Sequence, residues 1–189
     1  MLTLDALDSR RSTPTRQLGE PGPDDARLLR MLQTAVRVPD HGKRVPFRFL
    51  RIAGAARERL ADAAASRLLE REPGSGAGVV EKLRTRFLLP PVTVAVIARQ
   101  DEDAQIPASE RLSTAACVCL LLLQAAQAEG FGAQWLTGWP AYDREFLQHT
   151  LGLAGDEQLV GTIAIGTPAV AVPERDRPDA AALLADWRP

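Results

Sequence analysis

The feature that most constrains this fold is a long apolar segment, Ala115 to Ala128, inside a helix predicted from Pro107 to Glu129. The segment is apolar nearly all round, so we expect the helix to be buried on every side. Gln124 and Gln127 interrupt it, and a membrane span needs about 20 apolar residues, so we predict a core helix. A chain of 189 residues rarely hides a whole helix, and we therefore expect part of its surface to form a subunit interface.

The composition is that of a globular protein with one domain and a sizeable core. The chain has 23 Lys and Arg against 24 Asp and Glu, so its net charge predicts neither a nucleic-acid nor a membrane partner. Its first residues lack the continuous apolar stretch of a secretory signal. The two cysteines, Cys117 and Cys119, would point to different sides of a helix and cannot form a disulfide framework. We therefore expect a cytoplasmic protein.

Short strands and helices follow one another in an irregular order, which predicts the α+β class. Val92 to Ala98 is apolar on both faces, as a central strand would be, whereas Pro73 to Gly78 reads as a flexible linker. Other strands are expected at Phe47–Ala53, Ala133–Leu136 and Glu157–Ile165, with a loop over residues 13–23. Other helices are expected up to Ser9, from Pro23 to before Pro39, and at Ala55–Glu72, Val79–Phe87, Pro140–Leu151 and Ala180–Trp187.

Side chains able to carry catalysis on their own are scarce. The two histidines, His41 and His149, belong to no recognisable metal set with the cysteines, and the Gly-x-Ser-x-Gly elbow of many hydrolases is missing. We therefore predict no metal site and no obligatory acid, base or nucleophile. A cofactor that brings its own chemistry suits such a chain, because the protein then needs only to bind, orient and tune it.

The first candidate for binding such a cofactor is the segment Arg10-Arg11-Ser12, at the end of the first predicted helix. Guanidinium groups bind phosphate in bidentate fashion, and the serine hydroxyl supplies one further donor. The alternative is a solvated basic turn that closes the helix, where positive charge complements the helix dipole. From the residues alone, both interpretations stand.

Two later segments are further candidates. The segment Arg37-Val38-Pro39-Asp40-His41 follows the second predicted helix, where Arg37 could also be a helix-end cation and His41 a surface loop residue. Trp135, Leu136 and Thr137 follow the turn Gly130-Phe131-Gly132, and Trp135 could equally be core packing. The significance of both segments depends on their order and distance from Arg10-Arg11-Ser12.

In this order and at this spacing, the three segments resemble the compact bacterial nitroreductases, which bind FMN between two subunits. The resemblance runs from Leu4 through Gly166-Thr167-Pro168 at the end of the last predicted strand. It implies an α+β subunit with a mainly antiparallel central sheet flanked by helices, in a domain-swapped homodimer. Residues 1–168 would form one FMN-binding domain, and residues 169–189 a Pro-rich C-terminal arm.

The resemblance also implies roles for the three segments. The FMN phosphate and ribityl chain would be bound by Arg10, Arg11 and Ser12. The flavin and ribityl chain would lie along Trp135, Leu136 and Thr137, and the partner's copies of Arg37 and His41 would reach the same FMN. The implied activity is that of an FMN-dependent NAD(P)H oxidoreductase with a ping-pong cycle. NADH or NADPH delivers a hydride to flavin N5, and a nitroaromatic, quinone or related small-molecule acceptor then takes the electrons.

Some residues depart from the family pattern. Arg16 stands one position later than the matching family arginine, and Leu136 stands where compact members often have arginine. Arg84 and Arg86 could gate the pocket, but we interpret them as the basic face of a short helix. These departures keep two alternatives open: a flavin-dependent dehydrogenase of a specialised metabolite, and a flavin-binding dimeric scaffold without turnover.

Overall fold

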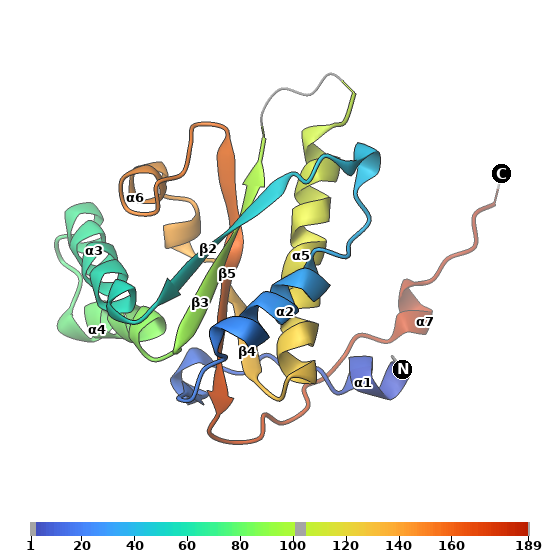
Figure 1. The fold of residues 1–189 in the computed structure, drawn as a ribbon, viewed down its shortest axis with the longest axis horizontal. Helices are drawn as coiled ribbons and strands as arrows, with labels where there is room; N and C mark the ends of the chain where they lie inside the picture. Colours follow the sequence, from blue (N-terminus) through green and yellow to red (C-terminus); the bar gives the residue numbers. More distant parts are fainter. Residues whose placement is uncertain (1–2, 101–104, 189) are drawn as a thin grey trace.

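The computed structural model describes residues 3–100 and 105–188 and confirms the α+β class (Figure 1). Single 3-10 turns are labelled η. The elements are α1 (Leu4–Asp8), η1 (Thr15–Gln17), β1 (Leu18–Gly19), α2 (Asp25–Ala35), η2 (His41–Lys43), β2 (Phe47–Ala53), α3 (Ala55–Arg71), α4 (Ala77–Leu88), β3 (Val92–Arg99), α5 (Ala108–Ala128), β4 (Gly132–Leu136), η3 (Trp139–Ala141), α6 (Arg144–His149), β5 (Glu157–Pro168) and α7 (Ala180–Leu183).

The described strands pair antiparallel throughout, as the resemblance implies. β3 lies between β2 and β5, so that Val96 faces Phe49 on one side and Gly161 on the other. β5 also pairs with β4 and, at its C-terminal end, with the short strand β1. Because β3 is paired on both edges and covered on both faces, nearly all of its residues are buried.

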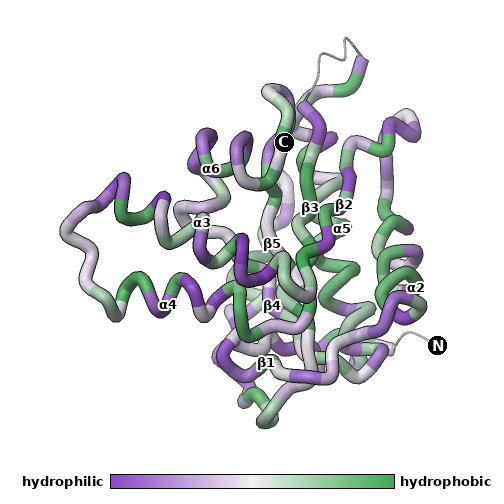
Figure 2. Tube along the Cα trace, turned by 60° about the vertical axis from the view of Figure 1, so that its left-hand side comes forward, coloured by the Kyte–Doolittle hydropathy of each residue, from purple (hydrophilic) through white to green (hydrophobic). Residues whose placement is uncertain are grey.

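Helices cover both faces of this sheet (Figure 1). α5 and α2 lie on one side, where a core forms around Met31, Val118 and Leu122. α3, α4 and α6 lie on the other side, around Leu60, Phe87 and other buried apolar residues. Figure 2 shows hydrophilic and hydrophobic residues alternating along α3 and α4, as expected for helices with one face toward solvent.

The predicted burial of the long helix on every side is wrong. α5 has the length and composition of a membrane span, but half of its apolar window is buried inside the fold, as in a core helix. The sheet and α2 cover only part of its circumference. Ser113, Cys117 and Leu120 remain exposed along one stripe, with Leu120 45% exposed. This exposed stripe is the part of the helix surface that the sequence analysis assigns to an interface.

Several predicted boundaries also need correction. The helix expected at Pro140–Leu151 is two elements, η3 and α6, because the Asp143 carboxylate caps α6 by accepting a hydrogen bond from the Phe146 N–H at 2.7 Å. The expected 13–23 loop contains η1 and β1, and α4 begins at Ala77, inside the expected linker. The expected helix at Ala180–Trp187 is shorter than predicted, because α7 ends at Leu183.

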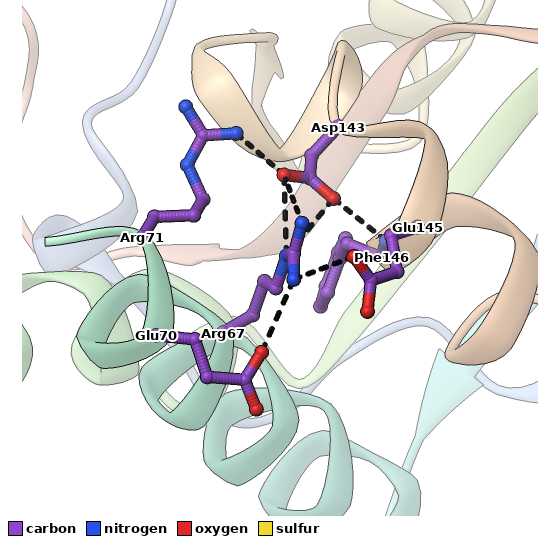
Figure 3. Close-up of polar contacts among 6 residues, drawn as sticks. All are labelled: Arg67, Glu70, Arg71, Asp143, Glu145 and Phe146. Carbon is purple, nitrogen blue, oxygen red and sulfur yellow. Dashed lines mark hydrogen bonds and ion pairs between the residues drawn. The ribbon is translucent and has the colours of Figure 1, made fainter.

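Asp143 is also the centre of a charged cluster between α3 and α6 (Figure 3). Its side chain is only 3% exposed and accepts hydrogen bonds from Arg67 and Arg71 of α3. Arg67 pairs in addition with Glu70 and with Glu145. Burial opposes ionisation, but the Phe146 N–H and the two arginines outweigh it and lower the pKa of Asp143. The cluster therefore fastens α6 to α3 through one ionised carboxylate.

A second buried carboxylate gives the fold a predicted sensitivity to acid. Arg48 donates to the two Glu157 oxygens at 2.6 and 2.7 Å, and these hydrogen bonds lower the pKa of Glu157 to about 2, below its ordinary 4.5. Because the pKa of Glu157 is lower in the folded chain than in the unfolded chain, its ionised carboxylate stabilises the fold fully above about pH 4.5. This stabilisation is lost as the pH falls from about 4.5 toward 2. We expect the urea midpoint of Glu157→Gln to change less than that of the wild type between neutral pH and about pH 3. Equal changes in the two proteins would contradict this assignment.

Candidate functional site

The loop that carries Arg10, Arg11 and Ser12 follows α1 and runs beside β4. Arg10 Nη1 donates to the Ser12 hydroxyl at 3.3 Å. The Thr13 N–H donates to the Ala133 carbonyl at 2.9 Å, and the Thr15 N–H donates to the Gln134 side chain at 3.0 Å. The structure therefore brings the turn that follows the first predicted segment beside the strand that leads into the third, although more than 100 residues separate them in the sequence.

The C-terminal arm adds arginines that the sequence analysis missed. The carboxylate of Glu174 pairs with Arg11 and, at 2.9 Å, with Arg177. The pKa of Arg10 is lowered first by burial and then by the nearby charges of Arg177, Arg175 and Arg11. The only sequence signal was the pair Arg175 and Arg177 in the Pro-rich arm, which reads as an ordinary solvated stretch.

This arrangement has the donors that an anion site requires. Four arginines gather around one carboxylate, which accepts from the guanidinium groups of Arg11 and Arg177 and from the Arg175 N–H. A carboxylate and a phosphate oxygen pair are recognised by the same forked donors, so the Glu174 side chain stands in for a phosphate here. The Arg10–Ser12 loop therefore fits the group that its sequence predicts.

Trp135, Leu136 and Thr137 lie at the end of β4 and just beyond it. Trp135 is half-buried, donates from Nε1 to the Val160 carbonyl at 3.3 Å, and packs so closely on Gly161 that a side chain there would collide with the indole. The packing interpretation of Trp135 therefore finds support in its contact with the sheet, and its contact with a flavin stays a prediction. The Thr137 carbonyl accepts a hydrogen bond from Arg86 of α4.

Arg86 does not lie on a solvated basic helix face, so that interpretation is wrong for this residue. It turns inward to Thr137, and burial lowers its pKa. Arg84 instead pairs with Asp62 of α3. Arg86 reaches from α4 to the residue after β4, where its guanidinium supplies a donor to the Thr137 carbonyl.

A cavity of about 720 Å³ opens between the 14–16 turn, the α3–α4 pair and the end of β4. Arg16, Arg86 and Gln134 contribute polar groups to its wall, and Leu136 and Trp139 contribute apolar surface. Its volume is within the range of small-molecule pockets, which run from about 300 to 1,000 Å³. The cavity adjoins the segment predicted to lie along a flavin, and it is large enough for an aromatic ligand.

Arg37 and His41 are exposed, and η2, which begins at His41, lies near the N-terminal end of α5 (Figure 1). His41 Nδ1 is 2.7 Å from Glu110 in the first turn of α5, whereas Gln127 in the last turn donates to the Ser9 hydroxyl. Since a helix rises 1.5 Å per residue, these contacts lie about 25 Å apart along α5. The second predicted segment and the first are therefore not brought together within one chain.

Comparison with known proteins agrees with this architecture. The model of the nitroreductase family matches residues 7–167. YdjA of Escherichia coli (strain K12), provisionally named an NAD(P)H nitroreductase, is 30% identical over 171 residues, which cover 89% of each chain.

Solved structures with the same fold include a nitroreductase-like protein from Bacillus cereus. Its TM-score is 0.86 at 24% identity, covering 99% of this chain and 98% of that one. A provisionally named nitroreductase from Desulfovibrio desulfuricans, solved in complex with FMN, has a TM-score of 0.72 at 23% identity, covering 98% and 97%. The family match over most of the chain and the shared fold lead to one conclusion: this chain belongs to the nitroreductase family.

Proposed function

We propose that this oxidoreductase uses FMN to pass electrons from NADH or NADPH to a nitroaromatic, quinone or related acceptor. The observation that carries the proposal is the cluster of Arg10, Arg11 and the arm arginines, because the loop that holds Arg10 and Arg11 continues through Pro14, Thr15 and Arg16 into the wall of the 720 Å³ cavity. A phosphate site next to a pocket for a flat ring is what FMN requires. In this reaction, the two-electron reduction of a nitro group to a nitroso group consumes one NAD(P)H and one proton and releases one water.

The chain's own residues would bind and orient the cofactor. When bound, FMN supplies a ring that accepts a hydride and passes electrons on. Arg10, Arg11 and Ser12 would hold the phosphate, and Arg11 would give up its ion pair with Glu174 to do so. The segment Trp135 to Thr137 lies along the ring and ribityl chain, and its contact with Gly161 keeps it close to the sheet. No side chain is needed as an obligatory acid or base, because solvent can return protons.

We further propose a homodimer in which two copies share each site. A second copy with its α5 antiparallel to the first would bring its Arg37 and His41 beside the Arg10 end of the first. The exposed stripe of α5 suits such contact, because Ser113 and Cys117 are small and Leu120 is apolar. The expected mass in solution is about twice the 20.4 kDa of one chain. Light scattering measures it, and a monomer with full FMN would contradict the shared site.

The experiment that tests the function is an absorbance spectrum of the purified protein from about 300 to 550 nm, before and after anaerobic NADPH or NADH. We expect a yellow protein that bleaches with either nucleotide and recovers when a quinone is added. Bound flavin that neither nucleotide reduces would favour the dehydrogenase of a specialised metabolite. A protein that binds FMN without any turnover would be the dimeric scaffold. A colourless protein that FMN does not stabilise against heat would contradict FMN dependence.

A further inference from the structure

The C-terminal arm is attached to the body of the fold at two points. At its start, β5 ends with Pro168, and the Ala169 N–H donates to the Gln17 carbonyl at 2.8 Å. Six residues after Pro168, the Glu174 carboxylate forms an ion pair with Arg11. Beyond Glu174, α7 extends away from the sheet with its residues exposed (Figure 1). A short tether therefore holds one carboxylate at the loop that follows α1.

The Glu174 carboxylate is surrounded by more positive charge than it neutralises. It pairs with Arg177 at 2.9 Å in addition to Arg11, and it accepts a hydrogen bond from the Arg175 N–H at 2.9 Å. Burial and then the charges of Arg177, Arg175 and Arg11 lower the pKa of Arg10, and the charge of Glu174 acts in the opposite direction. The four arginines and one carboxylate carry a net positive charge. A phosphate monoester, with a charge of about −1.5 to −2 at neutral pH, neutralises this cluster more completely than Glu174 does.

The short tether also determines which anions can replace Glu174. A group on a short flexible linker is present at its partner at an effective concentration on the order of millimolar. A free phosphate ion gains only the contacts with the arginines, so it competes poorly with a carboxylate that is always nearby. FMN would gain ring contacts as well, because the same loop continues through Pro14, Thr15 and Arg16 into the cavity wall. Glu174 lowers the apparent affinity for both anions by the same factor, but only the weakly bound free ion is thereby kept out.

We propose that Glu174 is an internal occupant of the arginine cluster, which excludes small anions such as inorganic phosphate and gives way to the phosphate of FMN. The proposal rests on the proposed function for the identity of the cofactor, whereas occupancy of the cluster stands on the two ion pairs of Glu174. Riboflavin has the same ring without a phosphate, so its binding does not require Glu174 to move. Removing the Glu174 charge should therefore change the binding of phosphates and leave the binding of riboflavin as it is.

The test is a titration of FMN into flavin-free wild type and Glu174→Gln, followed by the quenching of FMN fluorescence. In phosphate-free buffer, the Kd of the variant for FMN should be about 5- to 10-fold lower than that of the wild type, because no carboxylate has to be displaced. Adding about 10 mM inorganic phosphate should raise the Kd of the variant about 5-fold, and that of the wild type less than about 2-fold.

Two controls show whether the effect belongs to the phosphate and to Glu174. The Kd for riboflavin should be the same in the wild type and in Glu174→Gln. Asp176→Asn removes an equal charge from an exposed side chain of the same arm that takes part in neither ion pair of Glu174. Its Kd for FMN should stay within a factor of about two of the wild-type value.

A measurement without flavin separates this proposal from the proposed function. In flavin-free protein, about 10 mM inorganic phosphate should raise the Tm of Glu174→Gln by about 2–4 °C and that of the wild type by less than about 1 °C. This difference would support the internal occupant even in a protein that binds no FMN. Equal responses to phosphate and equal Kd values for FMN in the two proteins would overturn the proposal. A flavin that NADPH or NADH still bleaches in that case would leave the proposed function standing.

Discussion

Replacing both Arg10 and Ser12 with alanine is expected to raise the dissociation constant for FMN by about 100- to 1,000-fold. Each hydrogen bond from a charged donor to phosphate contributes about 1.5–3 kcal/mol, and a neutral hydroxyl about 1 kcal/mol. The two side chains already form one unit, since Arg10 donates to the Ser12 hydroxyl. Quenching of FMN fluorescence on titration with apoprotein measures the constant directly.

Arg30→Ala is the matched control for that experiment. Arg30 is an exposed arginine of α2 that pairs with Glu129 and has no role in the proposed site, so its removal should leave the dissociation constant within a factor of about two. Circular dichroism of the double variant checks that the fold persists. An unchanged dissociation constant in a folded double variant would refute the phosphate assignment.

The second large effect is a loss of stability, expected when Asp143 is replaced. Asp143→Ala should lower the free energy of unfolding by about 3 kcal/mol, because it removes the cap of α6 and the ionised partner of Arg67 and Arg71. The side chain is almost fully buried, so water cannot replace these contacts. Urea unfolding at neutral pH, followed by circular dichroism, measures the loss.

Two further variants of the Asp143 cluster separate the contributions of the Asp143 charge and of the exposed Arg67–Glu145 ion pair to the free energy of unfolding. Asp143→Asn keeps an N-cap acceptor but removes the charge, and it should lose about half as much stability as alanine. Glu145→Ala removes an exposed partner of Arg67, and it should cost less than about 1 kcal/mol. Equal losses in Glu145→Ala and Asp143→Ala would mean that burial of Asp143 contributes nothing.

Elements with a strong local signal were predictable from the sequence. The strand Phe47–Ala53 has the predicted bounds, and α5 begins and ends one residue inside its prediction. Proline and glycine bound the strand, and Gly130 follows the helix, so local backbone preferences set these limits. The stretch after Trp139 was less predictable, because a single buried contact, from the Phe146 N–H to Asp143, starts α6 four residues later than the pattern suggests.

The candidate site was predictable only where its residues form short motifs. The turn after Arg10-Arg11-Ser12 lies beside the strand that carries Trp135, and the contacts of both segments with FMN stay predictions. Arg86 was named together with Arg84 as an arginine that could gate the pocket, but it was interpreted as part of a basic helix face, because an arginine that turns inward looks in sequence like any helix arginine. Its direction depends on a carbonyl 51 residues away. The arm arginines were missed for the same reason, since only the folded chain brings them to Arg10.

The separation of the two binding segments along α5 has a genetic consequence. In the proposed dimer, each chain supplies its Arg10 end to one site and its His41 end to the other. A cell that carries one gene copy damaged at Arg10 and another damaged at His41 would therefore make mixed dimers in which both defects fall in the same site. The remaining site would be intact, so two inactive alleles would complement each other, whereas two alleles damaged at the same end would not.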